Sequence, residues 1–401
     1  MLEKYIARQP ILDTKLRVFA YELLFRSGPK NVYQPYANAS SSVIADSITL
    51  FDLEMLTGHA RAFINVDEVA LRLGAARLLP ADRIVVEILE TVRPTEDIVS
   101  ICRELRADGY QLALDDFLDE PVWAPLVDLA QFLKIDFRLM DQCARERLTK
   151  KYAGHGIALL AEKVETRKEM EEARKLGFQY FQGYFFCKPA MMETRDISRN
   201  KLVHLQLLTA VAKEEMDYEE IEASLKKDPS LLYRLLRYLN SPVLGLRSEV
   251  KSIRHAIDLL GETEFRRWAS IFAVVSMLNG NSPELIRTAL TRAYFCEEFS
   301  TQAGLREKSF TLFLMGLLSI ADALLDRPLK QVLDSMSVPQ ELKTALSGGT
   351  NRLSDVYQLL LALEQAEWPK LATCVTSLGC AEQKVPDSYQ LAIQKAATIG
   401  A

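Results

Sequence analysis

Several polar residues in the first half of the chain stand at or near the ends of short apolar runs, and their types suit metal-assisted chemistry. They are Glu22, Asn65, Glu87, Asp115 with Asp116, Lys134 with Asp136, Glu162 and Gln182. The set is rich in oxygen and lacks histidine and thiolate, which favours Mg²⁺ or Mn²⁺ over zinc. Several carboxylates cannot all stay ionised within a few Å of one another unless cations accompany them. Two bound ions can cleave a phosphodiester by polarising the phosphoryl oxygen and acidifying a water molecule.

Each of these residues also has an ordinary structural interpretation, because most charged side chains are simply solvated. Glu22 could be a surface acid, and Asp115-Asp116 a turn. Lys134 could form a surface ion pair with Asp136, or it could stabilise charge on an attacking water or take its proton. What favours a site is that the polar residues stand in register with seven predicted strand ends.

The elements that must position these residues alternate between strand-like and helical patterns. Between the apolar runs lie stretches with helical spacing, such as 96–105, which ends at Asp108-Gly109. Alternation of this kind predicts a parallel sheet, and the number of strands suits a closed β/α barrel, whose active site lies at the carboxyl ends of the strands. The apolar runs are 18–25, 61–66, 83–89, 110–117, 131–137, 156–164 and 180–186, with 6–12 as a candidate eighth.

The second half changes character after about residue 197, where strand-like runs fade and helical periodicity takes over. Asp228-Pro229 opens one helix with a capping residue and a proline in the first turn. Further helices are predicted at about 250–260, 262–279, 283–303, 308–326, 352–365 and 385–398. The expected fold is therefore a β/α-barrel domain at residues 1–197 followed by an all-helical domain at residues 198–401.

Composition argues against several classes of protein. The chain carries 49 Lys and Arg against 54 Asp and Glu, a net charge of −5, so we expect no nucleic-acid footprint. Its opening residues are too charged for a secretory signal, and its apolar stretches are too short to span a bilayer. The six cysteines are scattered without paired spacing, which favours reduced thiols in a cytoplasmic protein.

The polar residues stand in segments that resemble the EAL family of cyclic di-GMP phosphodiesterases, in the branch fused to a HDOD domain. The resemblance covers about residues 1–190. The matching segments are RQPI (8–11), YELLFR (21–26), INV (64–66), VEILE (86–90), LDDF (114–117), LKID (133–136), AEKVET (161–166) and FQGYFFCKP (181–189).

The resemblance implies a role for each matched residue in a site with two Mg²⁺ or Mn²⁺ ions. The metal ligands would be Glu22, Asn65, Glu87, Asp115 and Asp116. The catalytic residues would be Lys134, which assists the water, Glu162, which completes the metal shell, and Gln182, which positions the water. The nucleotide would be contacted by Gln9, Arg26 and Asp136, and Glu90 would anchor a loop.

Two departures from the family pattern bear on activity. The family continues Asp-Asp-Phe with Gly-Thr-Gly, in a loop that couples the metal site, the substrate and the dimer interface, whereas this chain has residues 118–121, Leu-Asp-Glu-Pro. Loss of both glycines makes any conformation with positive φ costly. Lys163 also replaces a glycine beside Glu162. The sequence therefore favours a protein that binds cyclic di-GMP with weak or no hydrolysis, and the alternative is an active phosphodiesterase that produces the linear dinucleotide.

Residues of about 200–390 resemble HDOD, through segments 228–242, 252–261 and 313–324. The related HD phosphohydrolases need a His-Asp pair, but none of the four histidines here is followed by aspartate, and Ser319 stands where relatives have the histidine. We therefore expect a non-catalytic domain that binds a protein partner in cyclic di-GMP regulation, of motility for example. A homodimer, and an unrelated β/α-barrel enzyme with a helical appendage, stay open as alternatives.

Overall fold

The computed structural model describes residues 4–27, 53–183, 199–213, 215–228, 253–277, 283–325 and 327–399. The chain divides into two compact units. One contains Met1–Lys188 and Leu361–Ala372, and the other contains Pro189–Leu360 and Thr373–Ala401. The predicted boundary between residues 197 and 198 lies outside the described residues, so it stays a prediction.

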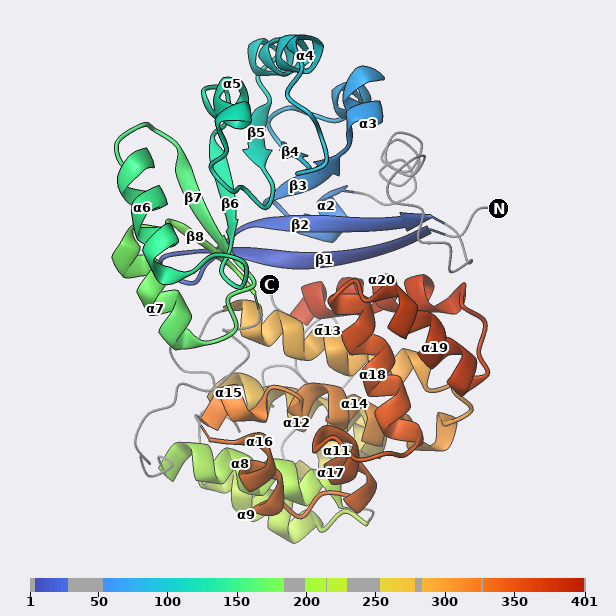
Figure 1. Cartoon of the computed structure of the whole chain (residues 1–401). Helices are drawn as coiled ribbons and strands as arrows, with labels where there is room; N and C mark the ends of the chain where they lie inside the picture. Colours follow the sequence, from blue (N-terminus) through green and yellow to red (C-terminus); the bar gives the residue numbers. More distant parts are fainter. Residues whose placement is uncertain are drawn as a thin grey trace. The chain divides into compact units, whose positions relative to one another are not determined.

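Eight strands close into a barrel in the first unit (Figure 1). Each of the seven predicted runs overlaps one strand, and the candidate eighth run lies inside another, so the predicted barrel is confirmed. The strands are β1 (Lys4–Asp13), β2 (Val18–Ser27), β3 (Arg61–Val66), β4 (Ile84–Ile88), β5 (Gln111–Leu114), β6 (Phe132–Asp136), β7 (Ala158–Glu162) and β8 (Tyr180–Gln182).

The prediction of a parallel sheet is wrong for β1, which runs antiparallel to both of its neighbours, β2 and β8. Only four residues link β1 to β2, too few for the crossover that a parallel pair requires. The turn is held by Asp13, whose Oδ1 accepts hydrogen bonds from the backbone N–H groups of Lys15 at 2.8 Å and Arg17 at 2.9 Å. The resulting register places Gln9 beside Glu22.

Helices follow most of the parallel strands. The helix predicted at 96–105 is confirmed as α4, and the residue after its cap, Gly109, has a φ of +93°. A capping box between Thr166 and Glu169 begins the last helix. The helices are α2 (Leu53–Thr57), α3 (Glu68–Arg72), α4 (Glu96–Ala107), α5 (Ala124–Val127), α6 (Gln142–Tyr152) and α7 (Arg167–Leu176).

Aromatic rings fill the barrel near the amino-terminal ends of its parallel strands. Phe19 stacks on Tyr180 with ring centroids 4.1 Å apart, and Phe63 meets Phe132 edge-on at 5.2 Å. Phe63 and Phe132 belong to a buried apolar cluster that also includes Leu160. This packed layer excludes water from beneath the opposite, carboxyl-terminal end of the barrel. Charges held there are therefore less screened than charges on the surface.

The described elements of the second unit are all helices, so the predicted all-helical domain is confirmed. The helix predicted from Asp228-Pro229 lies outside the described residues. The helices after the barrel are α8 (Arg199–Ala212), α9 (Tyr218–Lys226), α11 (Ile253–Leu260), α12 (Glu262–Met277), α13 (Pro283–Phe299), α14 (Ser309–Leu318), α15 (Ala321–Leu325), α16 (Leu329–Asp334), α17 (Gln340–Leu346), α18 (Arg352–Glu364), α19 (Trp368–Leu378) and α20 (Lys384–Ile399).

The single helix predicted at 308–326 is instead two helices, α14 and α15, which are interrupted at Ser319. The Ser319 hydroxyl donates to the carbonyl of Gly316 at 2.7 Å and accepts a hydrogen bond from Arg292 of α13 at 3.1 Å. A side-chain hydrogen bond to a carbonyl in the preceding turn competes with the backbone hydrogen bonds that would continue the helix. Gly316 permits the close packing of α13 on α14, because a Cβ at this position would lie 2.4 Å from the Arg292 carbonyl oxygen.

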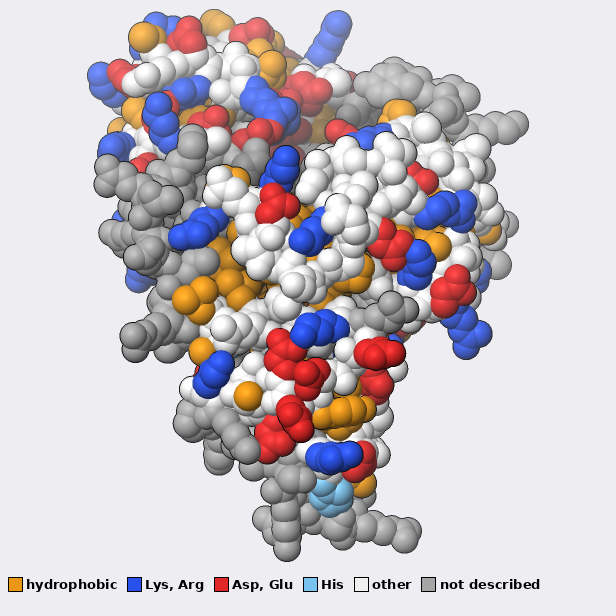
Figure 2. Space-filling view, turned by 90° about the horizontal axis from the view of Figure 1, so that it is seen from below, with side chains coloured by type: hydrophobic (Ala, Val, Ile, Leu, Met, Phe, Trp, Pro, Cys, Tyr) orange, Lys and Arg blue, Asp and Glu red, His pale blue; other side chains and the backbone are white. Residues whose placement is uncertain are grey.

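Among the described residues, no helix combines the length and apolar character that crossing a bilayer requires. In the view of Figure 2, Lys and Arg side chains stand among Asp and Glu side chains and form no continuous basic surface over the residues drawn in colour.

Candidate functional site

The carboxyl-terminal ends of the barrel strands gather four carboxylates around the ammonium group of Lys134. Its Nζ lies 3.0 Å from Asp115 Oδ1, 2.8 Å from Glu162 Oε1 and 3.8 Å from Glu22 Oε2, and it also donates to Glu87 Oε1. Lys134 is 1 % exposed and Glu87 is fully buried. The five residues come from β2, β4, β6 and β7 and from the end of β5, so a parallel sheet brings them together as the sequence predicts.

Two amides extend this cluster on the side of β2. Asn65 Nδ2 donates to Glu22 Oε1 at 2.9 Å. Gln182 Nε2 donates to Glu22 Oε2 and to Gln9 Oε1, the latter at 3.0 Å. The antiparallel β1 makes this last contact possible, because it carries Gln9 alongside Glu22 and Gln182. A cavity opens at this end of the barrel, and its lining includes Gln9, Glu22, Asp115, Asp116, Lys134, Glu162 and Gln182.

One ammonium cannot neutralise four neighbouring carboxylates, and the pKa values reflect this. Burial raises the pKa of Glu87 well above its usual range, and the other carboxylates raise it further against the opposing effect of Lys134. Burial likewise raises the pKa of Glu162 to about 8. At Asp115, burial is outweighed by attraction and hydrogen bonding to Lys134, so its pKa is lowered. Despite burial, the surrounding carboxylates raise the pKa of Lys134, which therefore holds its proton.

Four buried oxygen atoms of this cluster have no hydrogen-bond partner among the described residues. They are Asn65 Oδ1, Glu87 Oε2, Asp116 Oδ1 and Gln182 Oε1. Buried acceptors are normally satisfied, so each of these atoms calls for a cation or a water molecule. Oxygen atoms are the ligands that Mg²⁺ and Mn²⁺ prefer, and the residues present therefore fit the predicted ions.

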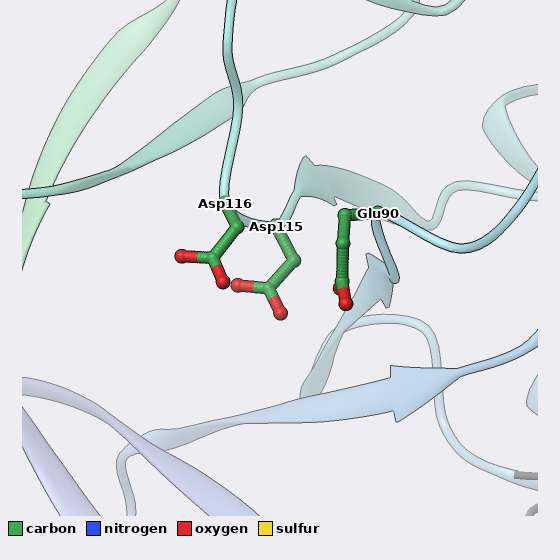
Figure 3. A group of neighbouring side chains, drawn as sticks. All are labelled: Glu90, Asp115 and Asp116. Carbon is green, nitrogen blue, oxygen red and sulfur yellow. The ribbon is translucent and has the colours of Figure 1, made fainter. Parts of the chain in front are cut away.

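A further carboxylate, Glu90, joins Asp115 and Asp116 in a group whose oxygen atoms lie within 4.8 Å of one another. Figure 3 shows all three side chains extending to the same side of the chain, with Asp115 between the other two. Burial raises the pKa of Glu90 and of Asp116, and the neighbouring carboxylates raise both further. The sequence indicated only a loop-anchoring role for Glu90. Glu90 stands only three residues after Glu87, and this spacing could have indicated that a second glutamate lies beside the site.

Of the residues expected to contact the nucleotide, Asp136 has partners within the barrel, and Arg26 falls partly outside the described residues. The Asp136 carboxylate accepts hydrogen bonds from the backbone N–H groups of Arg138 at 2.6 Å and Leu139 at 3.3 Å, and from the Lys163 ammonium. These contacts hold the chain as it leaves β6, so the structure gives Asp136 internal partners. Arg26 lies in β2, but its side chain is outside the described residues.

The altered loop after Asp116 has an anchor of its own. Asp119 has a φ of +58°, in the left-handed region that aspartate tolerates better than most residues. Its Oδ1 accepts hydrogen bonds from Tyr152 Oη at 2.5 Å and Lys151 Nζ at 2.6 Å, both on α6. The two positions of the lost glycines, Leu118 and Glu120, do not have positive φ, and the loop instead takes it at Asp119, which side chains of the same chain hold in place.

Replacement of Tyr152 by phenylalanine should lower the free energy of unfolding of the barrel by about 1.5 kcal/mol, since it removes a hydrogen bond to a charged acceptor. It should also weaken Mn²⁺ binding, because Asp115 and Asp116 begin the same loop. Chemical unfolding and calorimetric titration with Mn²⁺ measure the two effects. Tyr110→Phe is the matched control, because it also removes one tyrosine hydrogen bond, the one that Tyr110 donates to the Leu79 carbonyl at 2.7 Å. Equal Mn²⁺ affinity in the two variants would contradict the anchoring role.

Both halves of the chain match known domain families. Residues 61–189 match the EAL domain family and residues 200–339 match the HDOD domain family. "Cyclic di-GMP phosphodiesterase CdgJ" of Vibrio cholerae serotype O1 is 34% identical over 388 residues, which cover 94% of this chain and 89% of CdgJ. "Uncharacterized protein YuxH" of Bacillus subtilis is 33% identical over 374 residues, which cover 91% of each chain.

Among solved structures, the calcium and cy-diGMP complex of Klebsiella pneumoniae BlrP1 at pH 8.0 aligns with a TM-score of 0.39 at 24% identity, over 47% of this chain and 56% of that chain. The two sequence relatives match nearly the whole length of the chain, and the two domain matches follow one another in order along it. The chain therefore belongs to the family of proteins in which an EAL domain is joined to a HDOD domain.

Proposed function

We propose that the barrel is a metal-dependent phosphodiesterase that hydrolyses cyclic di-GMP to the linear dinucleotide. The observation that carries the proposal is the group of buried carboxylates around Lys134, with four oxygen atoms that lack a partner among the described residues. The name of the Vibrio cholerae relative supports the same substrate. The sequence favoured binding with little hydrolysis because of the altered loop, but Asp119 removes much of that objection.

The residues that would hold Mg²⁺ or Mn²⁺ are of two kinds. Glu22, Asn65, Glu87, Asp115 and Asp116 are the predicted ligands, and Glu90 joins them on the evidence of its position beside the two aspartates. Bound ions would polarise the phosphoryl oxygen and favour ionisation of the attacking water.

The remaining residues of the site orient the reactants. Gln182 is fixed through Nε2, which leaves its buried Oε1 without a described partner and able to accept a hydrogen bond from the attacking water. Lys134 holds the carboxylates of Glu87, Asp115 and Glu162 in place and retains its proton, so it acts as a positioning cation. In the reaction a P–O bond to water forms, the P–O bond to one ribose breaks, and the released ribose oxygen takes a proton.

A second candidate function is binding of cyclic di-GMP without turnover, and Lys163 is the observation that favours it. Its ammonium lies 3.8 Å from Asp116 Oδ1, in the cavity and beside the proposed metal ligands. A fixed cation there would oppose full metal loading. In either case we propose that the HDOD unit is not catalytic and presents its helices to a protein partner. A cytoplasmic location belongs to the same proposal.

The test is incubation of the full chain with cyclic di-GMP and Mn²⁺ or Mg²⁺, with separation of the linear product. The Glu87→Gln variant should lose turnover by at least about 100-fold, because it removes one proposed ligand charge. Glu120→Gln, an exposed acid on the altered loop, is the matched control and should retain turnover. Binding of cyclic di-GMP measured with Ca²⁺ but no product with either active metal would overturn hydrolysis in favour of binding alone. No binding would overturn both.

A further inference from the structure

Lys163 adopts a backbone conformation that is unusual for its type. It follows directly after β7 and Glu162, and its φ is +53°. A side chain with a Cβ pays about 1 kcal/mol or more to occupy the left-handed region. Val164 N–H donates to the Gln182 carbonyl at 3.0 Å and so fixes the chain on the other side of Lys163. The residue is thus held between two strands that both carry site residues.

The constrained backbone directs the Lys163 ammonium into the proposed metal site. Its Nζ contacts the buried Asp136 Oδ2 and lies 3.8 Å from Asp116 Oδ1. The two backbone N–H groups donate to Asp136 Oδ1, and Lys163 donates to Oδ2, so Asp136 tethers the ammonium, whereas Asp116 Oδ1 has no hydrogen-bond partner among the described residues. Asp116 in turn belongs to the group with Glu90 and Asp115. The ammonium therefore stands beside an acceptor that a divalent ion at this group would use.

We propose that Lys163 is a tethered cation that competes with a divalent ion for Asp116 and so lowers the affinity of the group formed by Glu90, Asp115 and Asp116. The inference rests on the proposed metal site and makes Lys163 a determinant of metal loading. Its physical basis is Coulombic, since a positive charge about 4 Å from the ligand oxygen repels an incoming divalent ion in a partly buried setting. The ion pairs of Lys134 are instead with Glu22, Glu87, Asp115 and Glu162.

The experiment is a Mn²⁺ titration of the full chain without nucleotide, with free Mn²⁺ followed by electron paramagnetic resonance. Lys163→Met keeps the length of the side chain and removes its charge, and it should bind Mn²⁺ at least about tenfold more tightly than the unchanged protein. Lys163→Gly should do the same, because it also removes the charge, while it relieves the backbone strain. Lys163→Arg should resemble the unchanged protein.

Lys175→Met is the matched control, because Lys175 is exposed in the last turn of α7 and its loss changes the net charge equally. Its Mn²⁺ affinity should not change. Equal affinity in Lys163→Met and the unchanged protein would overturn the inference while leaving the proposed hydrolysis intact. Tighter Mn²⁺ binding in Lys163→Met would support the inference even if no cyclic di-GMP were cleaved. Absence of Mn²⁺ binding in every variant would overturn both.

Discussion

Replacement of Lys134 by methionine is expected to lower the free energy of unfolding of the barrel by about 3–5 kcal/mol in the presence of a chelator, because it leaves buried carboxylates without their cation. The ammonium is 1 % exposed and contacts Glu87, Asp115 and Glu162. For a unit of this size the loss corresponds to a fall in Tm of about 10 °C. Turnover of cyclic di-GMP should also be lost, since the same contacts position the proposed metal ligands.

Thermal unfolding in chelator and in Mn²⁺ checks this expectation. Mn²⁺ should restore much of the lost stability, because the ion supplies the positive charge that the variant lacks. Combining Lys134→Met with Asp115→Asn should also recover stability, since attraction to Lys134 lowers the pKa of Asp115 and both members of that ion pair are then removed. Lys175→Met is the control for a general loss of charge. A Lys134→Met variant as stable in chelator as the unchanged protein would show that the carboxylates do not depend on this ammonium.

The barrel could be predicted from the sequence because apolar runs mark strands and because parallel strands align their carboxyl ends. The direction of β1 could not be read from its own residues, since apolar composition carries no information about polarity. The signal lay in the connection, because residues 14–17 are too few for a crossover. This detail matters to the site, since the antiparallel direction places Gln9 next to Gln182.

The site was predictable to the extent that its residues belong to strand ends. Glu22, Asn65 and Glu87 lie on β2, β3 and β4, where the register of the sheet fixes their neighbours. Asp119 and Glu90 lie on loops, whose path depends on contacts distant in sequence, such as the one from Tyr152 of α6 to Asp119. For this reason the sequence showed the loss of the loop glycines without showing the contact that anchors the altered loop.

Pairs distant in sequence were also missed in the helical unit. None of the four histidines precedes an aspartate in the sequence, yet His204 Nε2 of α8 lies 2.8 Å from Asp228 Oδ2. Among the described residues, no third His, Cys, Asp or Glu joins this pair in a potential metal-binding group. Ser319, which stands where the related enzymes have a histidine, accepts a hydrogen bond from Arg292 and donates one to the Gly316 carbonyl.

Replacement of Gly183 by alanine should lower the free energy of unfolding of the barrel by about 3 kcal/mol, which would place it among the most destabilising changes there. Gly183 follows Gln182 directly and has a φ of +141°. A Cβ there would lie 2.0 Å from the Val164 carbonyl oxygen and 2.6 Å from the Val164 nitrogen. These are backbone atoms and cannot rotate away, so the chain after β7 must separate from β8. That chain carries Lys163, and its displacement would also move Glu162 and Gln182.

Chemical unfolding compares this variant with Gly177→Ala, the matched control at the end of α7. Gly177 also has a positive φ, of +97°, but a Cβ there would meet no atom within 4 Å. Gly177→Ala should therefore lower the free energy of unfolding by only about 1 kcal/mol, which is the conformational penalty alone. Gly183→Ala should in addition lower turnover by about 100-fold, since a displacement of about 1 Å is enough to misplace Gln182. If the two variants were equally stable and equally active, close contact between Gly183 and Val164 would not be what holds Glu162 and Gln182 at the proposed site.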